Sequence, residues 1–154
     1  MEPVEFAAEA EKGIKLRFKT HKLKARPWNI VETVRLMTEA ASPDYGIIVD
    51  PNFTFETLEE SIRLAHELEK YNIEAFEIPI PQSNIDGYLE IQRGCEMLIT
   101  THFGNPDPVK AIKAGMNDSF IIAYLDSRAA NVKREATIAE SAHSSLWIQI
   151  VGSA

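Results

Sequence analysis

Hydrophobic and polar positions follow two different periods along this chain, which predicts alternating strands and helices. Short apolar runs of strand-forming residues recur from one end to the other. These runs are IKLRFK (14–19), YGIIVD (45–50), EAFEIP (74–79), EMLITT (96–101), SFIIAY (119–124) and LWIQIV (146–151).

The segments between these runs have the helical period of apolar residues and carry helix-capping residues. Thr57 and Glu60 have the spacing of a capping box, and Asn29 is a candidate N-cap. Asp107 can cap a helix that begins at Pro108. The predicted helices cover residues 5–12, 29–41, 57–71, 86–94, 107–115 and 128–143.

A repeated strand–helix pattern predicts an α/β fold with a parallel sheet, formed by residues 1–154 as one domain. Two architectures compete, an open doubly wound sheet and a TIM (β/α)8 barrel. No glycine-rich nucleotide loop follows any strand, which disfavours the doubly wound sheet of dinucleotide-binding proteins. A complete barrel needs about 250 residues. We therefore expect a partial barrel of about six parallel strands with intervening helices.

Composition narrows the classes of function. The net charge of −7 argues against a nucleic-acid partner. No apolar run approaches the roughly 20 residues of a membrane helix, so we expect no membrane partner. The acidic N-terminus lacks the pattern of a secretory signal. The single cysteine, Cys95, allows no internal disulfide, and a cytoplasmic location is expected.

Polar side chains stand where three successive predicted strands end. Asp50 ends the strand before Pro51, Glu77 lies just before Pro79, and His102 follows the next strand. The carboxyl ends of parallel strands meet at one edge, where active sites are built. Two carboxylates and one further ligand suit a divalent cation such as Mg²⁺. The alternative is that Asp50 and Glu77 are helix caps or turn residues.

The first predicted strand carries the opposite charge. Lys15, Arg17 and Lys19 alternate with apolar residues, so period two places them on one face. A solvated strand face would explain this pattern. In a barrel, however, the face could look inward, where cations must meet anions. The carboxylate of a small-molecule substrate could supply the anion, and a lysine there could act as a general base.

In this order and spacing, KLRFK, VDPN and FEIPIP resemble the barrel domain of the enolase superfamily, in the mandelate racemase and muconate lactonizing enzyme branch. The stretches HFGNPDP and LWIQIVG resemble one subgroup of that branch. The likeness covers nearly the whole chain. The family removes the proton α to a carboxylate and stabilises the product on Mg²⁺.

The resemblance implies roles for the residues at the strand ends. Asp50 and Glu77 would be the first two metal ligands, and His102 would stand in the third place. An imidazole there would favour Mn²⁺, Zn²⁺ or another divalent metal over Mg²⁺. Independently of the resemblance, Asn52 and Asn105 lie beside the proposed ligands and could orient them or bind substrate, although both could equally be turn formers.

The resemblance assigns the paired basic residues of the family either to Lys15 and Arg17 or to Arg17 and Lys19. One of these side chains would be the base or electrophile.

The sequence departs from the family where a base on the opposite face would stand. Ala123 and Gln149 occupy those places. A single base favours dehydration by a sugar-acid dehydratase, or a related lyase or isomerase reaction, over racemization. The N-terminal capping domain of the family and two barrel strands have no counterpart in the sequence, so we interpret the chain as a truncated piece.

A second hypothesis is a non-catalytic remnant or an oligomerising scaffold. The missing opposite-face base and His102 support it. A half-open parallel sheet exposes apolar edges, so a homo-oligomer is expected in either case.

Overall fold

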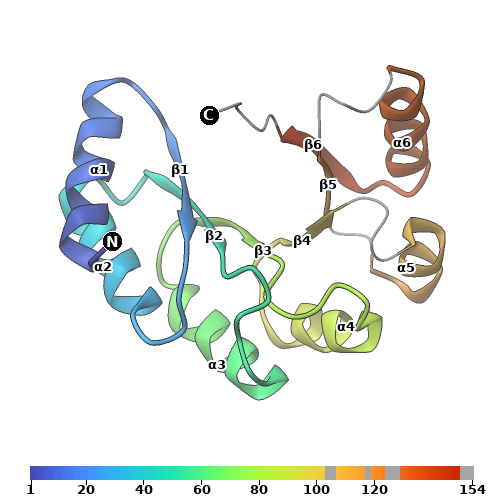
Figure 1. Cartoon of the computed structure of the whole chain (residues 1–154), viewed down its shortest axis with the longest axis horizontal. Coiled ribbons are helices and arrows are strands. Elements are labelled where there is room, and N and C mark those ends of the chain that lie inside the picture. The colour runs from blue at the N-terminus through green and yellow to red at the C-terminus, as the bar shows by residue number, and fades with distance from the viewer. Residues whose placement is uncertain (103–106, 117–118, 124–128, 150–154) are drawn as a thin grey trace.

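The computed structural model describes residues 1–102, 107–116, 119–123 and 129–149, and in them strands and helices alternate (Figure 1). The strands are β1 (Thr20–Lys24), β2 (Gly46–Asp50), β3 (Ile73–Glu77), β4 (Ile99–His102), β5 (Ser119–Ala123) and β6 (Ser145–Gln149). The helices are α1 (Pro3–Lys15), α2 (Ile30–Ala40), α3 (Leu58–Leu68), α4 (Ile85–Gly94), α5 (Pro108–Ala114) and α6 (Ala129–Ser141). The predicted alternation is confirmed.

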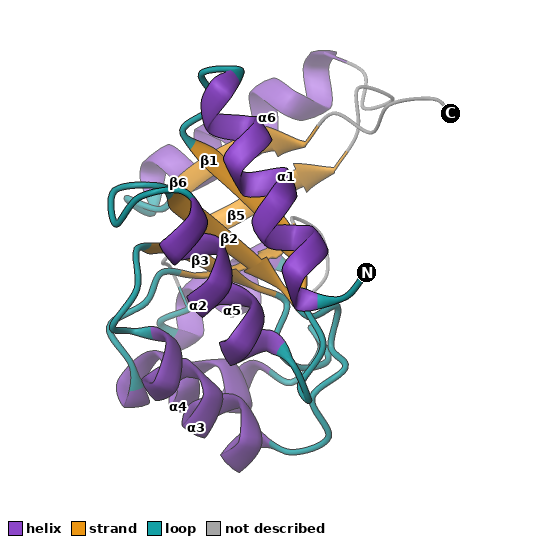
Figure 2. Cartoon of the chain, turned by 90° about the vertical axis from the view of Figure 1, so that its left-hand side faces the viewer, coloured by secondary structure: helices purple, strands orange, loops and turns teal. Residues whose placement is uncertain are grey.

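Within the described residues the sheet is parallel, and its six strands lie side by side in the order in which they occur along the chain. A doubly wound sheet reverses its strand order at a switch point, so that alternative is wrong. In Figure 1 the strands follow an arc and the helices lie outside it. Figure 2 shows α1 and α2 in front of the sheet, seen from the side of β1. The inner face of the sheet therefore carries no helix among the described residues.

The hydrophobic core lies between the outer face of the sheet and the helices. Alternate strand residues such as Leu23, Val49 and Phe76 point into it and are almost fully buried. The helices contribute one apolar side each, with Met37 of α2 and Leu64 of α3 as examples. This packing leaves the opposite face of each strand free for polar side chains.

Most predicted helix caps are confirmed. The side chains of Thr57 and Asp107 each accept a hydrogen bond from a backbone N–H in the first turn of their helices, and the structure adds the same cap at Asn84. Asn29 occupies the N-cap position of α2, but its side chain makes no capping hydrogen bond. Gly115 ends α5 with a φ of 98°, which glycine adopts without strain. Within the described residues, no helix combines the length and apolarity needed to cross a membrane.

The predicted strand over residues 14–19 is wrong. Helix α1 continues to Lys15, a turn follows, and the first strand starts at Thr20. The helix extends because Phe6, Ala10 and Gly13 repeat at i, i+4 and i+7 and face the core and Tyr45. The alternating pattern that suggested a strand therefore belongs to the end of a helix and an exposed turn.

Leucine-to-alanine substitutions should distinguish the two strand assignments. Leu23 is 1% exposed in β1, whereas Leu16 is 60% exposed after α1. We expect Leu23→Ala to lower the free energy of unfolding by about 2–5 kcal/mol, because it leaves a cavity in the core. Leu16→Ala should change it by less than about 0.5 kcal/mol. Urea unfolding of both variants gives the comparison, and equal losses would contradict the observed register.

Candidate functional site

An irregularity in the sheet aligns the two buried acids. Ile47 pairs with Ile73, but the next residue, Ile48, pairs with Ala75, so β3 has one extra residue at this point. Val49 then pairs with Phe76, which sets Asp50 beside Glu77. Because side chains alternate between faces, a regular ladder would have placed the two acids on opposite faces. The bulge brings both carboxylates to the inner face.

Two lysines of β1 contact these carboxylates. Lys22 Nζ lies 2.7 Å from Glu77 Oε1 and 3.1 Å from Asp50 Oδ2. Lys24 is the register partner of Asp50, and its Nζ lies 2.5 Å from the same Oδ2. The acid side chains are 1% exposed, the Lys22 side chain 30% and the Lys24 side chain 57%. Lys22 is therefore the inner cation of the cluster and Lys24 the outer one.

The lysines determine the charge state of Asp50. Burial alone raises the pKa of this carboxyl group. The hydrogen bond from Lys24, together with the charge and hydrogen bond of Lys22, lowers it by more, so the pKa of Asp50 lies below its ordinary value. Asp50 is thus held as a carboxylate, the form that can bind a cation.

Backbone hydrogen bonds tie three strand ends together. The N–H of Ile78 donates to the carbonyl of Thr100 at 3.0 Å, and the N–H of Phe53 donates to the carbonyl of Ile78 at 2.7 Å. Ile78 has a φ of 49°, a left-handed conformation that costs a β-branched residue about 1–3 kcal/mol. The link fixes the segments that follow Asp50 and Glu77 relative to each other.

The side-chain amides of Asn52 and Gln82 form hydrogen bonds with groups at the strand ends. Asn52 Nδ2 donates to Asp50 Oδ1 at 2.6 Å, and the Asn52 backbone N–H donates to the same oxygen at 3.1 Å. The backbone N–H of His102 donates to Gln82 Oε1 at 2.8 Å. Asn52 therefore orients a carboxylate of the cluster, which is one of the two roles predicted for it.

Several polar atoms at the site have no hydrogen-bond partner. Among the residues that the structure describes, the buried atoms Glu77 Oε2, Thr100 Oγ1 and His102 Nε2 find none, although His102 Nε2 lies 3.6 Å from Glu77 Oε1. Thr100 is the register partner of Glu77. Buried polar atoms without partners are costly, so the inner face next to Glu77 is prepared for a polar or charged ligand.

The structure brings together only part of the predicted site. Asp50, Glu77 and His102 lie at neighbouring strand ends, as expected. Lys15 is the last residue of α1 and pairs with Glu11.

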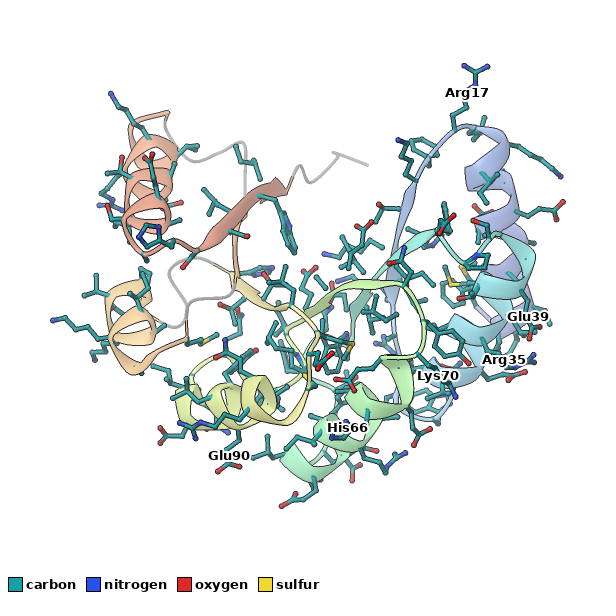
Figure 3. All side chains as sticks on the ribbon, turned by 180° about the vertical axis from the view of Figure 1, so that it is seen from behind. Arg17, Arg35, Glu39, His66, Lys70 and Glu90 are labelled. Atoms are coloured by element: carbon teal, nitrogen blue, oxygen red, sulfur yellow. The ribbon has the colours of Figure 1, made fainter. Side chains whose placement is uncertain are left out.

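Arg17 lies in the turn between α1 and β1 with a φ of 66°, at the outer tip of the molecule in Figure 3. Lys19 is exposed just before β1. None of the three predicted cations contacts the acids in the part of the chain that the structure describes, and Asn105 lies outside that part.

Sequence reasoning missed Lys22 and Lys24. Both lie in THKLK, where lysines alternate with Leu23 as regularly as in the preceding segment. Two signals could have identified them. The helical period of residues 6–13 argues for a longer helix, and the apolar Leu23 between the two lysines fits a strand with one core-facing side.

The donor groups of this cluster fit a divalent cation. Asp50 and Glu77 supply carboxylate oxygens, and His102 supplies an imidazole nitrogen. Among the described residues, however, no three His, Cys, Asp or Glu side chains are grouped closely enough to hold an ion as they stand. The Lys22 ammonium group lies between the two carboxylates instead. The donor groups of Asp50, Glu77 and His102 therefore suit a metal ion chemically. The ammonium group of Lys22 already contacts the two carboxylates.

Comparison with protein families gives a match over most of the chain. The sequence model of the family described as "Enolase C-terminal domain-like" matches residues 5–116. Among curated proteins, no sequence matches the chain.

Solved structures share the fold. The dipeptide epimerase from Enterococcus faecalis V583 is 21% identical with a TM-score of 0.88, over 98% of this chain and 45% of that chain. The N-succinyl Arg/Lys racemase from Bacillus cereus ATCC 14579 is 19% identical with a TM-score of 0.89, over 98% and 42%. A dipeptide epimerase from Cytophaga hutchinsonii, complexed with Mg and the dipeptide D-Ala-L-Val, is 25% identical with a TM-score of 0.86, over 96% and 42%. The chain thus spans less than half the length of these proteins.

The lowered pKa of Asp50 predicts acid sensitivity. A carboxyl group whose pKa is lower in the folded state binds protons preferentially when unfolded, so its stabilising effect is present above its unfolded pKa of about 3.9. The effect is lost as the pH falls through the folded pKa. The difference in unfolding free energy between wild type and Asp50→Asn should therefore shrink as the pH falls from 5 towards 3. Measurements about half a pH unit apart would follow this change.

Urea unfolding across this pH range measures the difference, with Asp44→Asn at an exposed position as the matched control. The control should change the unfolding free energy by less than about 0.5 kcal/mol, as is usual for an exposed side chain. A constant difference for Asp50→Asn would contradict the ionic role of Asp50.

Proposed function

Since this chain belongs to the enolase C-terminal domain-like family, we propose that it is part of a metal-dependent enzyme that removes the proton α to the carboxylate of a small substrate. The main support is the contact of Lys22 and Lys24 with Asp50 and Glu77 on one open face of a parallel sheet. This arrangement combines bases for a proton with ligands for a cation.

The sheet is proposed to be part of an eight-stranded barrel. Its strands are parallel and sequential, its helices lie outside, and the chain covers less than half of each similar structure. In the described part, β1 and β6 are the edge strands of the sheet. Further strands of a longer chain or a second copy would pair with them, and the homo-oligomer stays a prediction.

Asp50 and Glu77 are proposed to hold the ion, with His102 as a third donor. Carboxylate oxygens suit Mg²⁺, and the imidazole also suits Mn²⁺ or another divalent metal. The Mg in the Cytophaga hutchinsonii dipeptide epimerase complex supports a divalent ion. A bound ion would stabilise the negative charge that the substrate carboxylate gains when its α-carbon loses a proton.

Lys24 is the proposed base, in place of the predicted Lys15, Arg17 and Lys19. Its side chain is the more exposed of the two lysines and can reach a substrate lying on the inner face. Its Nζ would first release one proton to solvent and then accept the α-proton, while Asn52 keeps Asp50 oriented. Lys22 lies deeper and offers positive charge to the substrate carboxylate.

The reaction that follows proton removal depends on the opposite face. Ala123 and Gln149 are register partners in β5 and β6, and neither residue type is a general base. One base supports dehydration or another lyase or isomerase reaction that needs no second proton donor. The epimerase and racemase among the similar structures make racemization the alternative outcome.

Thermal unfolding tests the ion site. We expect Mg²⁺ or Mn²⁺ at millimolar concentration to raise the Tm of the chain, because a ligand that binds only the folded state stabilises it. The rise should vanish in Glu77→Gln and persist in Glu74→Gln, which alters an exposed acid of the same strand. A Tm that does not respond to either metal in the wild-type chain would exclude the proposed ion site.

Deuterium exchange tests the base. The full-length protein that contains this chain should catalyse exchange of the α-proton of a hydroxy or amino acid substrate in D₂O, as measured by NMR. Lys24→Ala should lower the exchange rate by about 100-fold or more, the usual contribution of a general base. Lys19→Ala should leave it unchanged. Metal binding without any exchange across a panel of acids would instead favour the non-catalytic scaffold.

A further inference from the structure

We propose that Lys22 is an internal counter-ion for the ion site, and that a divalent metal must displace its ammonium group to bind. This inference rests on the proposed function, because it concerns the same two carboxylates. It assigns Lys22 a role that differs from that of Lys24: it sets how tightly the site binds a metal.

The geometry makes the ammonium group and the metal mutually exclusive. Lys22 Nζ is 3.1 Å from Asp50 Oδ2 and 2.7 Å from Glu77 Oε1, so it lies between the two acids. A divalent ion shared by these acids would lie about 2.0–2.6 Å from the oxygens, in the same space. The two cations would also repel each other. Only one of them can bridge Asp50 and Glu77 at a time.

The alternatives to displacement are limited by the surroundings. Asp50 Oδ1 already accepts two hydrogen bonds from Asn52, so Oδ2 is the oxygen left for a cation. The other oxygen of Glu77, Oε2, is buried and has no hydrogen-bond partner within the described ranges. Asp50 Oδ2 already contacts both ammonium groups, so a metal bound there and to Oε2 would compete with Lys24 as well as Lys22, but only Lys22 also contacts Glu77.

Burial gives the ammonium group its effect on stability. Both acid side chains are 1% exposed, and two adjacent carboxylates without a cation would repel each other in a medium of low dielectric constant. Lys22 neutralises both, whereas Lys24 contacts only Asp50 and is mostly exposed. Removing Lys22 should therefore weaken the metal-free fold and leave a site with higher affinity for a metal.

Lys22→Met tests this exchange because it keeps most of the side-chain stem and removes the charge. In EDTA its Tm should fall below that of the wild type, and Mn²⁺ should restore it. Its Kd for Mn²⁺, measured by isothermal titration calorimetry after removal of EDTA, should be about tenfold lower or more, since a factor of ten needs less energy than a buried ion pair supplies.

Two matched variants isolate the charge at this position. Lys22→Arg retains a cation and should keep a Kd within about threefold of wild type, because the guanidinium still competes. Lys19→Met removes an exposed charge and should change neither Tm nor Kd.

An unchanged or higher Kd in Lys22→Met, or a Kd in Lys22→Arg as low as in Lys22→Met, would overturn the proposal. Failure of Lys22→Met to fold even with Mn²⁺ would do the same, because it would make Lys22 a purely structural group. A wild-type chain that binds Mn²⁺ with no change in Lys22→Met would leave the proposed function standing and refute only the counter-ion. If neither protein bound Mn²⁺, both proposals would fail.

Discussion

The site depends on the electrostatic problem of keeping Asp50 and Glu77 side by side beneath the protein surface. Two buried carboxylates in contact destabilise a fold unless cations accompany them. The chain solves this locally, since Lys22 bridges both acids and Lys24 contacts Asp50. The other features of the site serve the same constraint: Asn52 fixes one carboxylate oxygen, and Glu77 Oε2 and Thr100 Oγ1, which have no hydrogen-bond partner in the described part of the chain, can accept a further polar group. Exposed ion pairs such as Arg35 with Glu39, on the outer side of α2 in Figure 3, contribute far less, because water screens them.

Backbone irregularity is what makes this arrangement of charge possible. The bulge in β3 shifts the register by one residue and moves Glu77 to the face of Asp50. The left-handed Ile78 then turns the chain immediately after Glu77 and accepts the hydrogen bond from Phe53. Both features have an energetic cost, and the regular core on the outer face, with Ile47 and Phe76 fully buried, supplies the stability that tolerates them. Ile78 follows its strand, so its strain lies at the edge where the ligands converge, whereas the bulge lies earlier within β3.

Much of this could be predicted from the sequence, and the failures have a physical origin. The strand ends at Asp50 and Glu77 were predictable because proline follows closely in both cases, and proline cannot continue a central strand. Helix caps were predictable at Thr57 and Asp107, where local hydrogen bonds decide the structure. The first strand was misplaced because the alternating pattern of Lys15 to Lys19 is as regular as that of Lys22 to Lys24. Alternation does not tell a strand from an exposed turn; packing does, and only the second segment has a residue that the core buries. The bulge leaves no local signal at all, since it exists only as a register between two strands.

The position of the lysines also bears on how such a site could work with a substrate. Without the ammonium group of Lys22 between them, Asp50 and Glu77 would carry their full negative charge and would bind a divalent ion tightly. With Lys22 as a partner of both acids, binding of an ion becomes an exchange of one cation for another at the two carboxylates. The released ammonium group keeps its positive charge on the inner face, beside the ion. A substrate carboxylate would then meet two cations from different sources, while Lys24 remains near the α-carbon. One interaction would thus stabilise the fold before binding and contribute to substrate recognition afterwards.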